Sequence, residues 1–153
     1  MIKTAEITHV GFSGSREGMT EVQKALVYEY LLEISMFPGL KWFHHGDCIG
    51  SDREAHYISK KLVYAVHLHP PLDPRMRAFL QDDCDKVDEP WSYHGRNQRI
   101  VKATQLLLAT PFSSNPTASG GTWYTIRHAL TNNRPTVIFY RDGRIESYGL
   151  ERA

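Results

Sequence analysis

Three glycine-containing turns, each between an apolar run and a helical pattern, constrain the fold of this chain most strongly. They occupy residues 14–18, 46–52 and 119–122, and the third follows the apolar run 106–109 after a loop. Because glycine lacks a Cβ, the backbone at such turns can approach a ligand closely. Each turn also precedes a helix, whose first N–H groups and dipole attract a phosphate. Together the turns predict one shared site for a phosphorylated ligand.

Around these turns, predicted strands alternate with predicted helices. The strands are expected over residues 7–13, 41–45, 63–67, 86–88, 105–109 and 136–140, with an edge strand over 145–148. The helices are expected over 20–36, 51–62, 95–104 and 122–132, with a short helix over 74–81. This alternation predicts an α/β, Rossmann-like three-layer fold with a mostly parallel central sheet, formed as one domain over residues 1–153. In such sheets ligands bind at the carboxyl edge, where all three turns are expected.

Composition narrows the function classes. The chain has 153 residues, 41% of them hydrophobic and 23% charged, which is typical of a folded domain. Its net charge of +1 provides no general attraction for nucleic acid, and no apolar run approaches the roughly 20 residues of a membrane span. The first residues lack a secretory signal, and Cys48 and Cys84 form no CxxC pair. We therefore expect a cytoplasmic protein with reduced cysteines and no membrane partner.

Two of the turns carry the groups that phosphate binding requires. In the first, Gly14, Ser15 and Arg16 offer backbone N–H groups, a hydroxyl and a guanidinium that can bind a phosphate bidentately. In the third, Gly120, Gly121 and Thr122 place N–H groups and a hydroxyl at a helix start. The alternative for both is a tight turn selected for packing, with a solvated arginine. Trp123 and Tyr124 are candidates for stacking on a base or for the core.

The remaining candidates lie near these turns. Gly46, Asp47 and Ser51 are expected close to a sugar, with Asp47 as a candidate base, whereas Asp52 is expected to be a helix N-cap. Cys48 is expected to be a buried thiol rather than a nucleophile. Further polar residues are expected to converge on a polyanion or to lie on an ordinary charged surface; they are Arg96, Asn97, Arg99 and Arg127.

The histidines do not indicate a metal site by their spacing. His67 and His69 share one face of a predicted strand, but zinc needs at least a third ligand, and no motif supplies it. We therefore expect no metal and no resident cofactor. His45 or His69 is expected to line the ligand pocket at a strand end.

Four segments, taken in order, resemble the SLOG superfamily of Rossmann-like proteins, which includes the LOG phosphoribohydrolases and the DNA-binding DprA proteins. They span most of the chain and are Phe12-Ser13-Gly14-Ser15-Arg16, His45-Gly46-Asp47-Cys48-Ile49-Gly50-Ser51-Asp52, Arg96-Asn97 with Arg99-Ile100-Val101, and Gly120-Gly121-Thr122. The DprA likeness rests on Arg96-Asn97 and the glycine loops. The superfamily resemblance also implies a homo-oligomer.

The LOG resemblance implies hydrolysis of a nucleoside monophosphate to a free base and ribose phosphate. Arg96 matches the LOG catalytic arginine by its spacing to the central strand. At the positions of the LOG glutamates, however, this chain has Ile126 and Arg127, and eight residues separate Pro111 from Gly120. If the chain is a hydrolase, Glu17 or Asp47 must replace the missing carboxylate, because the N-glycosidic bond breaks through an oxocarbenium-like state.

The sequence thus predicts binding of a nucleotide or nucleotide-derived phosphorylated small molecule. The alternatives are a LOG-like nucleoside 5′-monophosphate N-glycosidase, with Arg96, Glu17 and Asp47 as catalytic candidates, and a DprA-like protein that binds single-stranded DNA. The net charge gives the DNA alternative no support.

Overall fold

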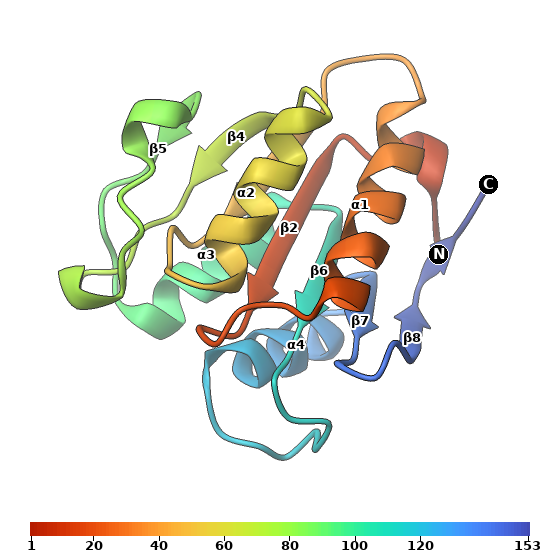
Figure 1. Cartoon of the computed structure of the whole chain (residues 1–153). Coiled ribbons are helices and arrows are strands. Elements are labelled where there is room, and N and C mark those ends of the chain that lie inside the picture. The colour runs from red at the N-terminus through yellow and green to blue at the C-terminus, as the bar shows by residue number, and fades with distance from the viewer.

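The centre of the fold is strand β2 (His9–Gly14), which lies between two parallel neighbours in a computed structural model that describes residues 1–153. The sheet has the order β5-β4-β3-β2-β6-β7-β8 (Figure 1). Its other members are β3 (Trp42–His45), β4 (Ala65–Leu68), β5 (Lys86–Val87), β6 (Leu106–Thr110), β7 (Thr136–Phe139) and β8 (Ile145–Tyr148). Only β8 is antiparallel, pairing with β7. The mostly parallel Rossmann-like sheet predicted from the sequence is confirmed.

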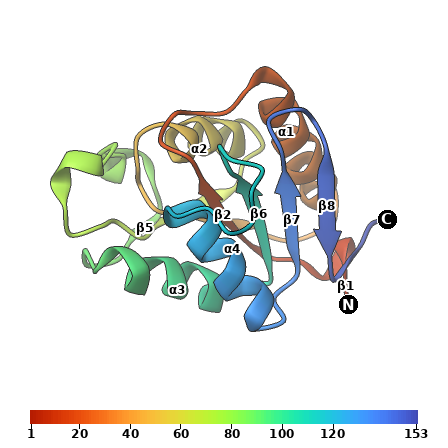
Figure 2. The same cartoon turned by 90° about the horizontal axis from the view of Figure 1, so that it is seen from below.

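Two helices cover each face of this sheet. Helices α1 (Glu21–Ser35) and α2 (Ser51–Lys61) pack on one face, and α3 (Tyr93–Ala103) and α4 (Gly121–Thr131) on the other, as the view from below shows (Figure 2). The α1 helix begins at Glu21, one residue after the predicted start, because Thr20 is its N-cap and the Thr20 side chain accepts a hydrogen bond from the Gln23 N–H. The α3 helix begins at Tyr93, two residues before the predicted start, since Ser92 caps it.

The direction in which successive strands are added to the sheet changes beside β2. Strands β3, β4 and β5 extend the sheet on one side of β2, and the chain then crosses to β6 on the other side. The switch in strand order therefore lies between the carboxyl ends of β2 and β6, where Gly14 pairs with Thr110. Figure 1 shows both arrowheads directed to the lower edge of the sheet, toward the long loop that follows β6. Ligands of such folds bind at this place.

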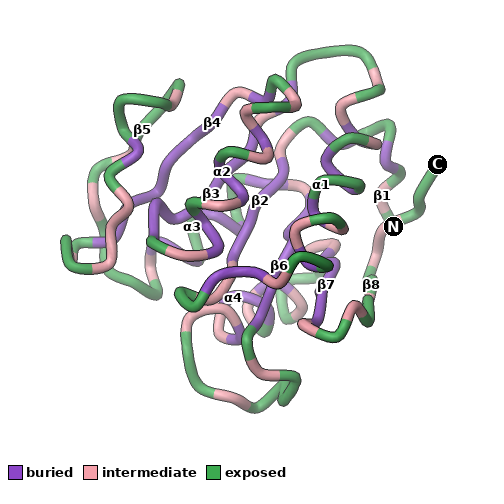
Figure 3. The backbone as a smooth tube through the Cα atoms, in the orientation of Figure 1, coloured by how far each residue is buried: buried purple, intermediate pink, exposed green.

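The hydrophobic core is formed around the apolar strands of the sheet. All five residues of β6 are buried, as expected for a strand covered on both faces. The largest cluster lies between the sheet and the α1–α2 layer and includes Phe12, Leu31 and Phe139. Figure 3 shows the buried residues along the central strands and the inward helix faces. Tyr28 and Leu32 on α1 and Met36 at its C-cap remain exposed, and the expected homo-oligomer stays a prediction.

The structure differs from the sequence expectations in two peripheral places. The short helix expected over residues 74–81 is instead two 3₁₀ turns, η2 (Pro74–Met76) and η3 (Gln81–Asp83). The backbone is already extended at Arg77, with a ψ of 141°, and Phe79 adopts a positive φ of 58°. A two-stranded sheet of β1 (Ile2–Lys3) and β9 (Leu150–Glu151) was not predicted. None of the helices has the length and hydropathy that a membrane span requires.

Candidate functional site

A cavity of about 350 Å³ opens at the carboxyl edge of the sheet, at the switch in strand order. We call it the rim cavity. The loop after β2 and the start of α4 form opposite walls, and Phe112, Ser113 and Tyr93 close it. The first wall consists of Gly14, Ser15, Arg16 and Glu17, and the second of Ser119, Gly120, Gly121, Thr122 and Trp123. The structure therefore brings the first and third glycine turns together.

The second glycine turn supports the first rather than lining the rim cavity. The Ser51 hydroxyl donates to the Ser15 carbonyl at 2.6 Å, and the Ser51 N–H donates to the same oxygen at 3.0 Å. Gly50 has a φ of 84°, and a Cβ at that position would lie 2.3 Å from the Arg16 carbonyl oxygen. Ser51, expected near a sugar, is buried and fixes the loop that carries Arg16.

The start of α4 differs from the starts of the other helices. Thr20 and Ser92 cap α1 and α3 with their side chains, and the α2 start donates to the Ser15 carbonyl. At α4 the N-cap residue is Gly120, and no side chain caps the helix. Its first N–H groups have no partner within the helix and belong to residues that line the rim cavity. Backbone donors and the positive helix end there provide a site for an anion.

Arg16 and Glu17 are the charged residues of the rim cavity wall, and both are exposed. Neither has an ion-pair partner in the protein. The Arg16 guanidinium contacts the Met76 sulfur at 2.9 Å, a weak acceptor that leaves most of its N–H groups free. Arg16 is thus available to a ligand.

A second cavity, of about 410 Å³, adjoins the rim cavity and shares Arg16, Tyr93, Gly120 and Gly121 with it. We call it the side cavity. Its own wall includes Pro71, Leu72, Asp73 and Met76, so it is more apolar than the rim cavity. Tyr93 lines both cavities, and a Cβ on Gly121 would lie 2.1 Å from the Tyr93 hydroxyl oxygen. Gly121 is therefore needed for the contact with Tyr93.

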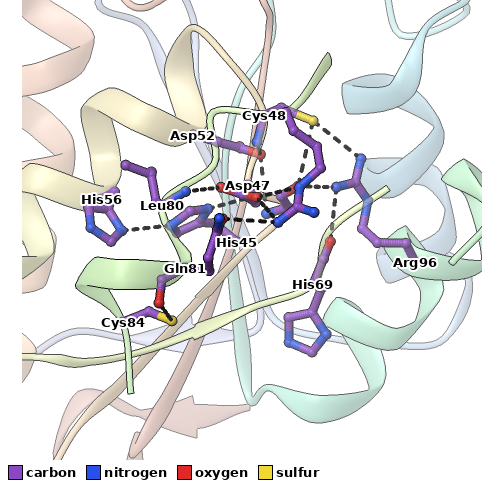
Figure 4. A network of polar contacts seen from close by, with 12 residues as sticks. His45, Asp47, Cys48, Asp52, His56, His69, Leu80, Gln81, Cys84 and Arg96 are labelled. Carbon is purple, nitrogen blue, oxygen red and sulfur yellow. Dashed lines mark hydrogen bonds and ion pairs between the residues drawn. The ribbon is translucent and has the colours of Figure 1, made fainter. Parts of the chain in front are cut away.

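Asp47 lies outside both cavities, in a buried polar network (Figure 4). Its carboxylate accepts hydrogen bonds from Arg77 Nε at 2.9 Å and from the Leu80 N–H at 3.0 Å. Asp47 therefore holds the segment after β4 against the β3–α2 loop, and its expected place beside a sugar is not observed.

Arg96 is also buried, although its position on α3 points it toward the carboxyl edge. It donates to the Gly46 carbonyl and, at 3.1 Å, to the His69 carbonyl, and it contacts the Cys48 sulfur at 3.6 Å (Figure 4). A Cβ on Gly46 would overlap the guanidinium, so Gly46 makes room for Arg96 rather than for a ligand. The Arg96 Nε atom is buried without a hydrogen-bond partner.

The expected N-cap role of Asp52 is wrong. Its carboxylate turns back to accept hydrogen bonds from the N–H groups of Gly46 at 3.1 Å and Cys48 at 3.2 Å, while Gly50 occupies the N-cap position. Burial raises the pKa of Asp52 to about 6 and that of Cys48 to about 11. The Cys48 group is thus a thiol at neutral pH, as expected for a buried cysteine.

The remaining predicted residues lie apart from the rim cavity. Asn97 is buried beside Arg96 at a void of only about 10 Å³. Arg99 stacks on Trp91 at 4.2 Å and faces a different hollow. Arg127 donates to the carbonyls of Pro116 and Ala118, which ties down the loop before α4.

The aromatic and histidine candidates also have defined places. Trp123 is 4% exposed and packs in the core, although its edge reaches the rim cavity. Neither His45 nor His69 lines the rim cavity, because both are buried. His44 lies close to His67 and His69 on neighbouring strands, a cluster that spacing along the sequence did not reveal. The parallel register of β3 and β4, which pairs His44 with His67, is the signal that would have revealed it.

No protein-family model and no curated protein matches this sequence. Solved structures do match the fold. DNA processing protein A (DprA) from Streptococcus pneumoniae superposes with a TM-score of 0.64 at 16% identity, over 88% of this chain and 51% of that one. This chain thus spans about half the length of that DprA chain.

Two further structures match similarly. The molybdenum cofactor binding protein from Rippkaea orientalis gives a TM-score of 0.63 at 18% identity, over 86% of this chain and 76% of that one. DprA from Helicobacter pylori, a protein with a single-stranded DNA binding mode, gives 0.62 at 14% identity, over 88% and 66%. The likeness to these structures confirms, at the level of the fold, the Rossmann-like architecture predicted from the sequence.

Proposed function

We propose that this protein binds a phosphorylated, nucleotide-type small molecule in the rim cavity. The observation that carries the proposal is the convergence of two glycine turns, 14–17 and 119–122, on one cavity at the switch in strand order. The uncapped start of α4 and the unpaired Arg16 supply the donors for phosphate oxygens. The Thr122 hydroxyl, on the same wall, is a further donor.

The side cavity would accept the apolar part of such a ligand. It continues from the rim cavity across Arg16 and Tyr93, and Pro71, Leu72 and Met76 offer it an apolar wall. A polar pocket that continues into an apolar one suits a molecule with a phosphate at one end and a ring at the other. The names of the structural neighbours agree with a binding function, since they include a cofactor-binding and a DNA-binding protein.

The test is calorimetric titration with AMP, GMP, CMP and UMP, each compared with its nucleoside. We expect monophosphates to bind and nucleosides to bind at least tenfold more weakly. Arg16→Ala should weaken binding of the monophosphate roughly ten- to a hundredfold, since a hydrogen bond to a charged group contributes about 1.5–3 kcal/mol. Arg53→Ala is the matched control, because Arg53 is an exposed arginine on α2 without an ion pair. Equal affinity for nucleosides and monophosphates would contradict the proposal.

The hydrolase alternative rests on one observation, the place of Glu17 on the rim cavity wall. Of the two carboxylates that the sequence offers as substitutes for the missing glutamate, Asp47 is held by Arg77 and Leu80, whereas Glu17 is free. Incubation with nucleoside monophosphates, followed by chromatography, tests for the released base. Release that disappears in Glu17→Gln would establish the hydrolase. Binding without release would leave a binding protein.

A further inference from the structure

Three buried histidines and two half-buried polar residues form a cluster on the α3 face of the sheet, away from the cavities. His44 pairs with His67 across β3 and β4, and His69 follows two residues later on the same face. One ring nitrogen from each of the three lies within 4.8 Å of the others, and all three residues are buried. His9 of β2 and Asp88, which follows β5, complete the cluster.

The contacts within the cluster join the rings through their nitrogens. His44 Nδ1 lies 2.9 Å from His69 Nε2, and His44 Nε2 lies 2.9 Å from His9 Nδ1. The Asp88 carboxylate lies 2.8 Å from His67 Nε2 and 3.0 Å from His69 Nδ1. The His69 Nδ1 contact is short but poorly aligned, so this buried nitrogen has no proper hydrogen bond. The polar groups here are thus only partly satisfied by one another.

The charge state of the cluster suits a cation. Burial lowers the pKa of His44 to about 2 and that of His69 to about 4, so both rings are neutral at neutral pH. Neutral imidazole is the form that coordinates a metal, so neither His44 nor His69 has to lose a proton first. The Asp88 carboxylate supplies a negative charge against the cations Lys86 and Arg96 nearby.

We propose that His44, His67 and His69 bind a divalent transition-metal ion of the zinc type, with Asp88 as the carboxylate that orients the imidazoles. Zinc holds imidazole nitrogens at about 2.0–2.1 Å, which places two tetrahedral ligands roughly 3.3 Å apart. His44 Nδ1 and His69 Nε2 must therefore separate by only about 0.4 Å from their present contact. Carboxylates beside metal-bound histidines commonly fix the ring orientation in this way.

The three histidines leave one tetrahedral position, which a water would fill. We assign the site a structural rather than a catalytic role, because its ligands are buried and it opens into neither cavity. The ion would join β3 to β4 and, through Asp88, to the segment after β5, at the side of the sheet where β5 has only two residues. This proposal does not depend on the phosphorylated ligand.

The experiment begins with the chain treated with a chelator and then titrated with Zn²⁺ and with Co²⁺. We expect uptake of about one ion per chain, the visible absorption of tetrahedral Co²⁺, and a higher Tm with Zn²⁺ present. No uptake by the wild-type chain would overturn the proposal without any variant.

Variants identify the ligands. His44→Gln and His67→Gln should each abolish the Co²⁺ absorption; His67 is the least buried of the three, at 9% exposure, so its substitution is the least disruptive to the fold. Asp88→Asn should lower the affinity roughly ten- to a hundredfold, the usual effect of losing an orienting carboxylate.

Two histidines serve as matched controls. His56→Gln removes a buried histidine that lies with His45 outside the cluster, and His94→Gln removes an exposed one. Both should retain metal uptake. Unchanged uptake in His67→Gln, or loss in His94→Gln, would show that the ion binds elsewhere and would overturn the proposal.

Discussion

At the scale of single residues, Asp52 stabilises the loop before its helix, although the sequence predicts that it caps the helix. An aspartate at the start of a helix can accept hydrogen bonds from the first turn of that helix or from the loop before it. The backbone decides: Gly50, with a φ of 84°, takes the N-cap position and lets Asp52 reach the N–H groups of Gly46 and Cys48. The sequence shows that Gly50 and Asp52 are present, but it does not show the backbone conformation that points the Asp52 carboxylate back to the preceding loop.

The pH dependence of stability should report the burial of Asp52. Its pKa is about 6 in the folded chain against an ordinary value of 3.8, so between these pH values only the folded state holds the proton. The free energy of unfolding contributed by Asp52 therefore falls as the pH rises through this window, by up to about 1.4 kcal/mol per pH unit. Denaturant unfolding of the wild type and Asp52→Asn should show this difference between about pH 4 and 6, the window between the two pKa values.

The control is Asp82→Asn, which removes an exposed carboxylate without an ion pair. Its stability relative to the wild type should not change with pH across the same window. A difference between wild type and Asp52→Asn that stays constant with pH would contradict the assignment of a raised pKa to Asp52.

At the scale of elements, the turns were the most predictable part of the chain, and the contacts between them the least. The strand–turn–helix order places 14–17 and 119–122 at one edge because the parallel topology requires it. The sequence does not show that the second turn packs under the first through Gly50 and Ser51. Likewise the His44–His67 pair depends on the register between β3 and β4, and the β1–β9 pair joins residues from opposite ends of the chain.

The packing between the first two turns predicts a specific difference between two glycine substitutions. Gly50 and Gly120 both have positive φ, but a Cβ at Gly50 meets the Arg16 backbone, whereas a Cβ at Gly120 meets nothing within 4 Å. Gly120 has a φ of 113° and a ψ of 163°, a conformation essentially restricted to glycine, so Gly120→Ala should cost about 1–3 kcal/mol of stability from backbone strain alone. Gly50→Ala should cost about 1–3 kcal/mol more, since the Arg16 loop must move.

Chemical denaturation of the two variants measures this difference directly. Gly50→Ala should also weaken monophosphate binding through the displaced Arg16, while retaining the α4 donors. Equal losses of stability in the two variants would show that the close approach of Gly50 to Arg16 contributes nothing beyond backbone strain.

At the scale of the whole molecule, the sheet topology and the net charge bear on ligand binding in separate ways. In sheets of this kind ligands bind at the switch in strand order, which here lies between the ends of β2 and β6. The net charge of the chain determines how strongly it attracts a polyanion such as nucleic acid. With 18 basic and 17 acidic residues, the chain has no general positive field, so attraction at the rim cavity depends on Arg16 and the α4 start.

The salt dependence of binding should therefore be shallow. Each phosphate neutralised on a single strand contributes a slope of about −0.7 to the logarithm of the affinity against the logarithm of salt concentration. AMP has no condensed counterion layer, so its binding should depend only weakly on salt. An oligonucleotide held by Arg16 and the α4 start should give a slope of about −1 and bind no more tightly than AMP. Titrations of AMP and of a single-stranded oligonucleotide over a range of salt concentrations measure both slopes. A steep slope, of about −3 or beyond, together with tighter oligonucleotide binding would show that several phosphates are neutralised. It would place the function with the single-stranded DNA binders, because one arginine and one helix start cannot neutralise that many phosphates.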